Sequence, residues 1–301
     1  MKEHFLRAVV AAALAATCLG ASAGPVILGG DDLTDHGFRS GGANMEGWLY
    51  IEKAVSNILG GVTRAGTINF DIAALGSAAN PAFTAGNAGG AIGSAANVLG
   101  KTVLYIDGAA AISQFFVDLA AGTVNVNMMW MAGTGAANDL VAAEGSALTA
   151  DAIAINAFVG SGGGLMAHGS GPTAYGWLFA LLPGIVEAPV CTATGATLTA
   201  AGQAAFPGLS NNDINQNAGP CHSSFSGNFG GLQTLALDGN QRSYIIGGGS
   251  GTLIQCGLPG QPPCPPTGVP EPGSLPLVLL AALGLALPAL RRARASKGGS
   301  T

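Results

Sequence analysis

The chain has 301 residues, of which 49 are Gly and only 9% are charged, and its formal net charge is −5. This length is enough for one large domain or two small ones. An acidic chain with so few Lys and Arg residues argues against nucleic acid and anionic lipid as main partners, because both require clustered positive charge.

The first 23 residues have the pattern of a secretory signal peptide. Two basic residues, Lys2 and Arg7, precede an apolar stretch over residues 8–19, and a small-x-small pattern follows at residues 21–23. Cys18 leaves a lipoprotein as a second interpretation. We expect signal peptidase to remove this segment during export.

The next part of the chain predicts strands that alternate with helices. Apolar runs predict strands over residues 25–32, 67–72, 102–107, 124–131 and 162–168. Apolar residues at helical spacing predict helices over residues 48–59, 112–119, 153–158 and 177–181. This alternation indicates a parallel sheet covered on both faces, a three-layer, doubly wound α/β domain with a flavodoxin-like core.

Residues 73–100 interrupt the alternation. They are rich in Gly, Ala and Asn, and the sequence Gly-Ser-Ala-Ala-Asn occurs twice, at 76–80 and 93–97. Two copies are too few for a solenoid. We therefore expect a long Gly/Ala-rich loop over residues 73–100.

After Pro183 the composition changes, with more Thr and Asn and with several cysteines. Strands are predicted over residues 232–237 and 244–246, joined by an Asp-Gly turn. We expect an α/β extracellular domain over residues 24–258, whose part 184–258 is a β-rich, disulfide-containing extension.

Removal of the signal peptide leaves four cysteines, and an even number in an exported chain favours two disulfides. They are Cys191, Cys221, Cys256 and Cys264. Three pairings are possible, and proximity in the sequence favours Cys191–Cys221 and Cys256–Cys264. No Cys-x-x-Cys spacing is present, so we predict no zinc site, and no cofactor.

The C-terminal tail has the features of a membrane helix. A Pro-rich linker over residues 259–272 leads to an uncharged run over residues 275–290, and Arg291 and Arg292 follow at once. As a helix the run would span roughly 24 Å, close to the ~30 Å hydrocarbon core. Basic residues stay on the cytoplasmic side, so the preceding domain would lie outside the inner membrane.

The order of three parts in this tail resembles the PEP-CTERM sorting signal of Gram-negative bacteria. Pro270-Glu271-Pro272 comes first, the apolar helix second and Arg291-Arg292 third. The resemblance implies an exosortase-type enzyme that processes the tail, with residues 273–301 as the sorting helix and basic end. It also implies a place in the cell envelope or the extracellular matrix, often beside exopolysaccharide.

Polar side chains follow several of the predicted strands, where ligands bind in doubly wound sheets. The candidates at strand ends are Asp31, Asp32, Asp35, His36, Asp107, His168 and Ser170, and His222, which follows Cys221, is a further candidate. Each has a structural alternative: the aspartates suit loops and caps, and the histidines suit hydrogen bonds to neighbouring loops. The Asp-Asp-x-x-Asp-His spacing matches no tight metal site. Trp130 and Trp177 are predicted core residues.

The core also resembles, loosely, the class I glutamine amidotransferase-like superfamily and its ThuA-like members. The resemblance lies in the strand and turn over residues 162–170 and in the segment 206–213. It implies a nucleophile at the sharp turn, but His168-Gly169-Ser170 holds no Cys there, so the glutaminase activity does not carry over.

Two functions follow as hypotheses. The first is an exported, non-catalytic surface or matrix protein that binds polysaccharide through the strand-end loops. The second is an extracellular hydrolase with His168, Ser170 and either Asp31 or Asp32 in its site. A hydrolase requires a nucleophile or metal within hydrogen-bond reach of a base.

Overall fold

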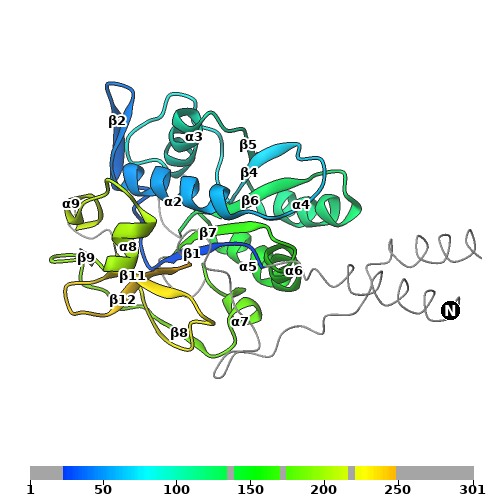
Figure 1. Cartoon of the computed structure of the whole chain (residues 1–301). Coiled ribbons are helices and arrows are strands. Elements are labelled where there is room, and N and C mark those ends of the chain that lie inside the picture. Colours follow the sequence, from blue (N-terminus) through cyan, green and yellow to red (C-terminus); the bar gives the residue numbers. More distant parts are fainter. Residues whose placement is uncertain (1–22, 134–138, 170–173, 216–220, 249–301) are drawn as a thin grey trace, which may run out of the picture. The chain divides into compact units, whose positions relative to one another are not determined.

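The computed structural model of the chain describes residues 23–133, 139–169, 174–215 and 221–248 (Figure 1). Within these residues, helices alternate with the strands of a mixed sheet whose central part is largely parallel. The fold is therefore α/β, as the alternation of apolar patterns predicted.

Five strands form the parallel part of the sheet, in the spatial order β5-β4-β6-β7-β1. They are β1 (Val26–Gly29), β4 (Phe70–Leu75), β5 (Val103–Ile106), β6 (Val126–Met131) and β7 (Gly164–His168). Each overlaps an apolar run that predicted a strand. The runs are nearly continuous, without polar alternation, because both faces of this part of the sheet are covered.

The position of β1 in the sheet determines where the loop that follows β1 lies. From β4 onward the parallel strands follow the order 2-1-3-4 of a flavodoxin sheet, in which a fifth strand follows the fourth. Here β1, the first strand of the chain, takes that fifth place beside β7. The loop after β1 therefore lies next to the loop after β7, far away in the sequence.

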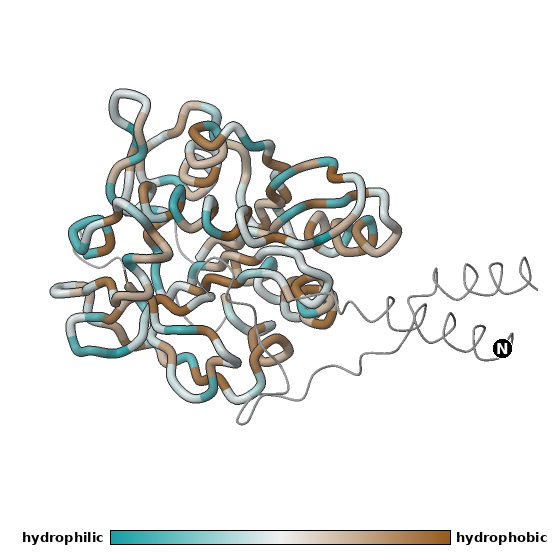
Figure 2. Tube along the Cα trace, viewed as in Figure 1, coloured by the Kyte–Doolittle hydropathy of each residue, from teal (hydrophilic) through white to brown (hydrophobic). Residues whose placement is uncertain are grey.

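Each face of the sheet has its own hydrophobic core, and apolar residues concentrate in the strands and helices (Figure 2). α2 (Gly47–Gly61) and α3 (Ala88–Leu99) belong to one core. The other core includes residues of α4 (Ala109–Ala121), α5 (Ala142–Ala150), α6 (Ala152–Gly160) and α7 (Leu178–Leu181). Neighbouring strand residues point to opposite faces, so Ile27 joins the first core and Leu28 the second.

The prediction of a long loop over residues 73–100 is wrong, because α3 occupies much of this segment. The helix begins after Asn87, whose side-chain oxygen accepts a hydrogen bond from the Gly90 amide at 3.0 Å. Gly90 also allows a close approach to α2, since an added Cβ would lie 3.1 Å from the Trp48 ring. α3 consists largely of small residues such as Gly90, and composition alone does not distinguish such a helix from a loop.

The β-rich part after residue 184 continues the central sheet. β12 pairs antiparallel with β1, and β10 and β8 follow in turn, while β11 pairs with β12 and β9. The strands are β8 (Ile185–Ala188), β9 (Thr197–Leu198), β10 (Ser224–Gly227), β11 (Gln233–Leu237) and β12 (Ser243–Gly247). The remaining elements are the hairpin β2 (Gly37–Ser40) and β3 (Ala43–Glu46) and the short helices α8 (Ala200–Ala205) and α9 (Asn211–Asn215).

A disulfide joins Cys191 and Cys221 and confirms one of the two predicted bridges. Cys256 and Cys264 lie outside the described residues. Residues 1–22 of the predicted signal peptide, the linker and the sorting tail lie outside them as well. In the part of the chain that the structure describes, no helix has the length and apolar character needed to cross a membrane.

Candidate functional site

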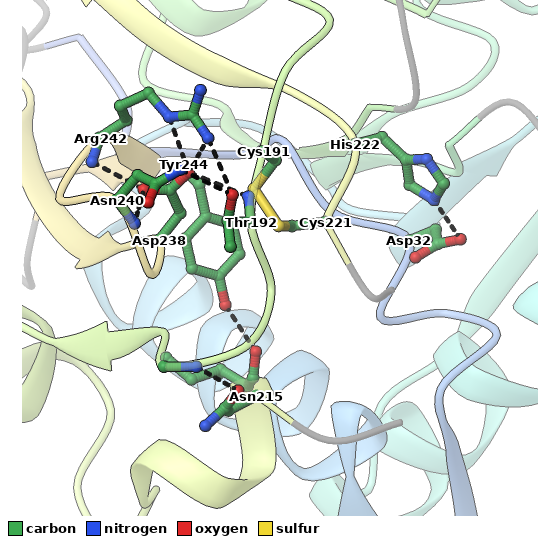
Figure 3. The surroundings of a disulfide bond; sticks show 12 residues. Asp32, Cys191, Thr192, Asn215, Cys221, His222, Asp238, Asn240, Arg242 and Tyr244 are labelled. Carbon is green, nitrogen blue, oxygen red and sulfur yellow. Dashed lines mark hydrogen bonds and ion pairs between the residues drawn. A yellow bond between two sulfur atoms is a disulfide. The ribbon is translucent and has the colours of Figure 1, made fainter. Parts of the chain in front are cut away.

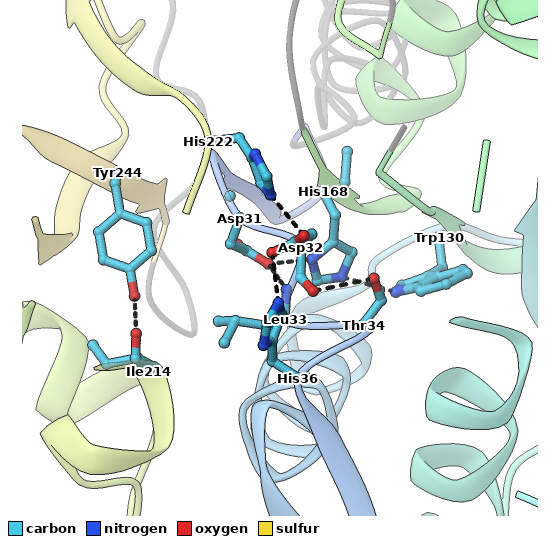
Figure 4. A network of polar contacts seen from close by, with 12 residues as sticks. Asp31, Asp32, Leu33, Thr34, His36, Trp130, His168, Ile214, His222 and Tyr244 are labelled. Atoms are coloured by element: carbon cyan, nitrogen blue, oxygen red, sulfur yellow. Dashed lines mark hydrogen bonds and ion pairs between the residues drawn. The ribbon is translucent and has the colours of Figure 1, made fainter. Parts of the chain in front are cut away.

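Polar side chains from the ends of β6 and β7, from the loops after β1 and β6, and from the segment before β10 meet at the carboxyl ends of three neighbouring strands (Figure 4). Ligands of open α/β sheets bind at such ends. We name this group the strand-end cluster. Its members are Asp31, Asp32, Thr34, Asp35, His36, Trp130, Asp139, His168 and His222.

The inner part of the cluster is a buried chain of three side chains. His168 Nδ1 lies 2.6 Å from Asp31 Oδ1, and neither side chain is exposed to solvent. Trp130 Nε1 donates a hydrogen bond to His168 Nε2 at 3.2 Å. An indole only donates, so Nε2 is unprotonated and Nδ1 carries the proton that the Asp31 carboxylate accepts. Both ring nitrogens of His168 are therefore engaged within the fold.

In this arrangement both ring nitrogens of His168 are bonded to side chains of the fold, Asp31 and Trp130. The sequence proposed it as a candidate catalytic residue together with Ser170 and Asp32. Ser170 lies outside the described residues. A general base requires a free ring nitrogen within reach of the reacting proton. In the buried chain described above, His168 has none to offer, and it instead holds the end of β7 against the loop after β1.

The outer part of the cluster is centred on Asp32. His222 Nε2 lies 2.6 Å from Asp32 Oδ2, and His36 Nε2 lies 3.5 Å from Asp32 Oδ1. The exposed fractions of the side chains are 15% for Asp32, 22% for His36 and 43% for His222. The sequence proposed all three, and the structure brings them together across 190 residues. Of these three side chains, His222 offers the largest exposed surface.

In this outer part of the cluster, Asp32 favours the protonated form of both histidines, and the histidines favour the ionised form of Asp32. Hydrogen bonding to Asp32 is the main cause that raises the pKa of His222 and of His36 above the ordinary histidine value. Burial acts to raise the pKa of Asp32, but the bonds from the two histidines outweigh it and hold this pKa below its ordinary value. The Asp32 carboxylate therefore lies between two imidazoles that are readily protonated at mildly acidic pH, and His222 is the more exposed of the two.

A glycine allows the His222 segment to lie directly on the loop after β1. The amides of His222 and Ser223 both donate to the Gly30 carbonyl, at 2.7 and 2.9 Å. A Cβ added at Gly30 would lie 1.9 Å from the Ser223 carbonyl oxygen, which no side chain could accommodate. The close approach at Gly30 is therefore a requirement for the contact between His222 and Asp32.

A pair of carboxyl groups, those of Asp35 and Asp139, lies beside the group around Asp32. Thr34 Oγ1 donates to Asp139 Oδ1 at 3.3 Å, while Asp35 Oδ1 and Asp139 Oδ2 are buried and receive no hydrogen bond from another group of the described chain. Two carboxyl groups bond to each other only if they share a proton. Burial, followed by nearby negative charge, raises the pKa of Asp35 to about 6 and that of Asp139 to about 8. The pair therefore holds one proton near neutral pH.

Asp107 is not part of the cluster. It follows β5, which β4 and β6 separate from β7, and its side chain is exposed. Of the predicted candidates, the structure thus assembles Asp31, Asp32, Asp35, His36, His168 and His222, and it leaves Asp107 at the far edge of the sheet.

Trp130, Thr34 and Asp139 are the members that the sequence analysis did not propose for the site. Asp139 follows the strand over residues 126–131, so the rule that selects polar residues after parallel strands would have found it. Trp130 matches its prediction as a fully buried core residue, but its bond to a histidine depends on strand order and has no sequence signal.

No group of three or more His, Cys, Asp or Glu side chains in the described ranges is arranged to hold a metal ion. Comparison of the chain with protein-family models, with curated proteins and with solved structures finds no match.

Proposed function

We propose that this chain is an exported, PEP-CTERM-type protein of the cell envelope or extracellular matrix, and that it binds exopolysaccharide or another envelope component without transforming it. An exosortase-type enzyme would process the tail after transfer across the inner membrane. The observation that carries the binding role is Asp32, held between His36 and His222 at the accessible part of the strand-end cluster.

Export is supported by both ends of the sequence and by the disulfide. The first 23 residues fit a secretory signal, and the tail carries Pro270-Glu271-Pro272, an apolar run and Arg291-Arg292 in the order of the sorting signal. Disulfides persist in oxidising compartments and are rare in the cytoplasm, so the Cys191–Cys221 bond fits an exported domain.

The chemistry of the outer cluster suits a ligand rich in hydroxyl groups. A hydroxyl both donates and accepts hydrogen bonds, and here a carboxylate acceptor lies between two imidazole donors. Asp32 engages His222 Nε2, so Nδ1 is the ring nitrogen that a ligand would meet. Charge-assisted hydrogen bonds are stronger than neutral ones. This favours recognition of a sugar chain through hydrogen bonds to its hydroxyl groups, without stacking of the sugar on an aromatic ring.

The hydroxyl groups near the cluster bond to carboxylates and not to its histidines, which argues against hydrolysis by a hydroxyl nucleophile. Thr34 donates to Asp139 and Ser223 donates to Glu187 at 2.5 Å. Among the described residues, neither His36 nor His222 has a Ser, Thr or Cys side chain as a hydrogen-bond partner, so a hydroxyl or thiol nucleophile paired with one of these bases is absent there.

On the fold, we propose a relationship to flavodoxin-like and amidotransferase-like cores. The order β5-β4-β6-β7 corresponds to the 2-1-3-4 part of the flavodoxin sheet. The fifth place in the sheet is filled by β1, which precedes the other four strands in the sequence. A relationship to these folds would therefore require that the strand in the fifth place has moved from the end of the strand sequence to its beginning.

The binding role is tested by calorimetric titration of the host's exopolysaccharide into the protein purified from that host. We expect Asp32→Asn to weaken binding about tenfold or more, because it removes a charged acceptor. Asp107→Asn is the matched control, since it removes an exposed carboxylate at the far edge of the sheet, and we expect no change. Equal affinity of wild type and Asp32→Asn would reject the role of this cluster.

An extracellular hydrolase is the second candidate, favoured by the Asp35–Asp139 pair. A protonated and an ionised carboxyl side by side provide a general acid and a general base. The measurement is the release of reducing ends from the host's polysaccharide, with Asp139→Asn as the inactive reference. If wild type releases no more than this variant, the hydrolase is rejected.

A further inference from the structure

We propose that the Cys191–Cys221 disulfide is a positioning element of the strand-end cluster: it holds His222 against Asp32, and the ligand site is complete only while this bond is intact. The ligand part rests on the proposed function above. The placement of His222 rests on the contacts of its own segment and stands independently of any ligand.

The segment that carries His222 lies against the loop after β1. Cys221 directly precedes His222, and its backbone pairs with that of Asp31 in an antiparallel bridge. The next two amides donate to the Gly30 carbonyl. β10 begins immediately afterwards at Ser224. Three consecutive residues are thus held close to β1, with the disulfide at their first position.

The other half of the disulfide belongs to an anchored part of the fold (Figure 3). The amide of Thr192, next to Cys191, donates to Asp238 Oδ2 at 3.0 Å. Asp238 is buried and also accepts a hydrogen bond from Arg242 Nε at 2.8 Å. The disulfide therefore connects the His222 segment to the turn between β11 and β12.

The ion pair alone is a weak restraint on the imidazole. His222 is 43% exposed, and exposed ion pairs contribute little because water screens them and side-chain entropy opposes them. A covalent link at the preceding residue limits the backbone positions from which His222 extends. Asp32 then selects one imidazole position within that limited range.

Reduction removes this link without removing either partner of the ion pair. Dithiothreitol transfers two electrons and two protons, so the S–S bond breaks into two thiols and the reagent becomes a cyclic disulfide. Residues 191 and 221 are then no longer joined. We expect the His222 imidazole to lose its contact with Asp32 for much of the time. The hydrogen bond between the buried Asp31 and His168 side chains should remain.

The test is a pH titration of the histidine resonances by NMR in the protein purified with its disulfides intact. The hydrogen bond to Asp32, aided by the charges of Asp31 and Asp35, raises the pKa of His222. After reduction, and in the double variant Cys191→Ser/Cys221→Ser, it should titrate near its ordinary value of about 6.5. The matched control Cys256→Ser/Cys264→Ser should keep the raised value.

Two further resonances separate positioning from general stability. His36 should keep its raised pKa in every sample, because it lies near Asp32 on the same loop. Amide hydrogen exchange should increase at residues 221–223 but not in β7. An unchanged His222 titration after reduction would overturn the proposal. Loss of protection in β7 as well, or a serine variant that does not fold, would overturn it too, since the bond would then stabilise the whole fold.

The ligand part has a separate measurement with the host's exopolysaccharide as probe. Reduction should weaken binding by wild type about tenfold, and it should have no further effect in His222→Gln, which lacks the imidazole already. An additional loss in His222→Gln would contradict positioning through His222. If wild type binds no polysaccharide, the proposed function fails, while the NMR titration still decides the role of the disulfide.

Discussion

His168 donates a hydrogen bond to Asp31 across the carboxyl ends of β7 and β1, with Nδ1 and Oδ1 2.6 Å apart and both side chains fully buried. Trp130 on β6 donates to the other ring nitrogen, so two bonds connect three neighbouring strands. The solvent-facing group around Asp32 follows directly in the chain. The buried Asp31–His168 pair thus holds in place the backbone from which Asp32 extends.

The first prediction concerns stability. His168→Ala removes the imidazole partner of the buried Asp31 carboxylate, which keeps only the Leu33 amide, and it leaves the Trp130 N–H without its acceptor. We expect the free energy of unfolding to fall by about 3–5 kcal/mol. His222→Ala is the control, because its exposed ion pair should contribute less than about 1 kcal/mol. Urea unfolding measures both. Similar losses in the two variants would contradict the distinction between the inner and outer parts of the cluster.

The second prediction concerns pH. The raised pKa of His222 means that its contribution to stability is complete below about pH 6.5 and is lost as the pH rises through the raised value. The lowered pKa of Asp32 means that its contribution is present above about pH 4 and is lost as the pH falls through the lowered value. The pair therefore stabilises the fold most between about pH 4 and 6.5.

Urea unfolding of wild type and Asp32→Asn over a series of pH values measures this window. The difference in the free energy of unfolding should be largest inside the window and should shrink on both sides. The effect should also decrease at high salt, because the pair is partly exposed. A difference that is constant with pH would show that Asp32 acts without its charge.

The third prediction concerns the carboxyl pair. Because the pKa values of Asp35 and Asp139 are raised, the folded state becomes less favourable as the pH rises from about 4 through the raised values. Asp139→Asn removes one acid, and its amide can donate to Asp35. We expect it to gain about 1–2 kcal/mol relative to wild type between pH 4 and pH 8.

Thermal unfolding at pH 4, 6 and 8 measures this gain, with Asp107→Asn as a control that changes one exposed carboxylate. The control should follow wild type at every pH. If Asp139→Asn were no more stable relative to wild type at pH 8 than at pH 4, the two carboxyl groups would not share a proton.

The fourth prediction concerns Gly30. Gly30→Ala places a Cβ 1.9 Å from the Ser223 carbonyl oxygen, so the His222 segment must move away. We expect a loss of about 1–3 kcal/mol in the free energy of unfolding and a His222 pKa near its ordinary value. Gly60→Ala, in a helix with open space around it, should be neutral or stabilising. A raised His222 pKa in Gly30→Ala would refute the close approach.

Much of the fold could be predicted because the strands are local patterns. Val26, Ile27 and Leu28 form a continuous apolar run, and such runs occur in strands that are buried on both faces. The same reasoning failed for α3, where Gly90 and its small neighbours pack against α2. Small residues carry no hydrophobic pattern, so neither a helix nor a close contact can be recognised from them.

The α/β class, the positions of the parallel strands and most of the polar residues of the cluster could be predicted from local patterns in the sequence. Which of these residues meet depends on the order of the strands in the folded sheet. β1 lies beside β7, which brings Asp31 to His168, and β12 and β10 on its other side bring His222 to Asp32 across 190 residues. Periodicity reports which face of an element is buried, whereas strand order depends on packing between distant segments.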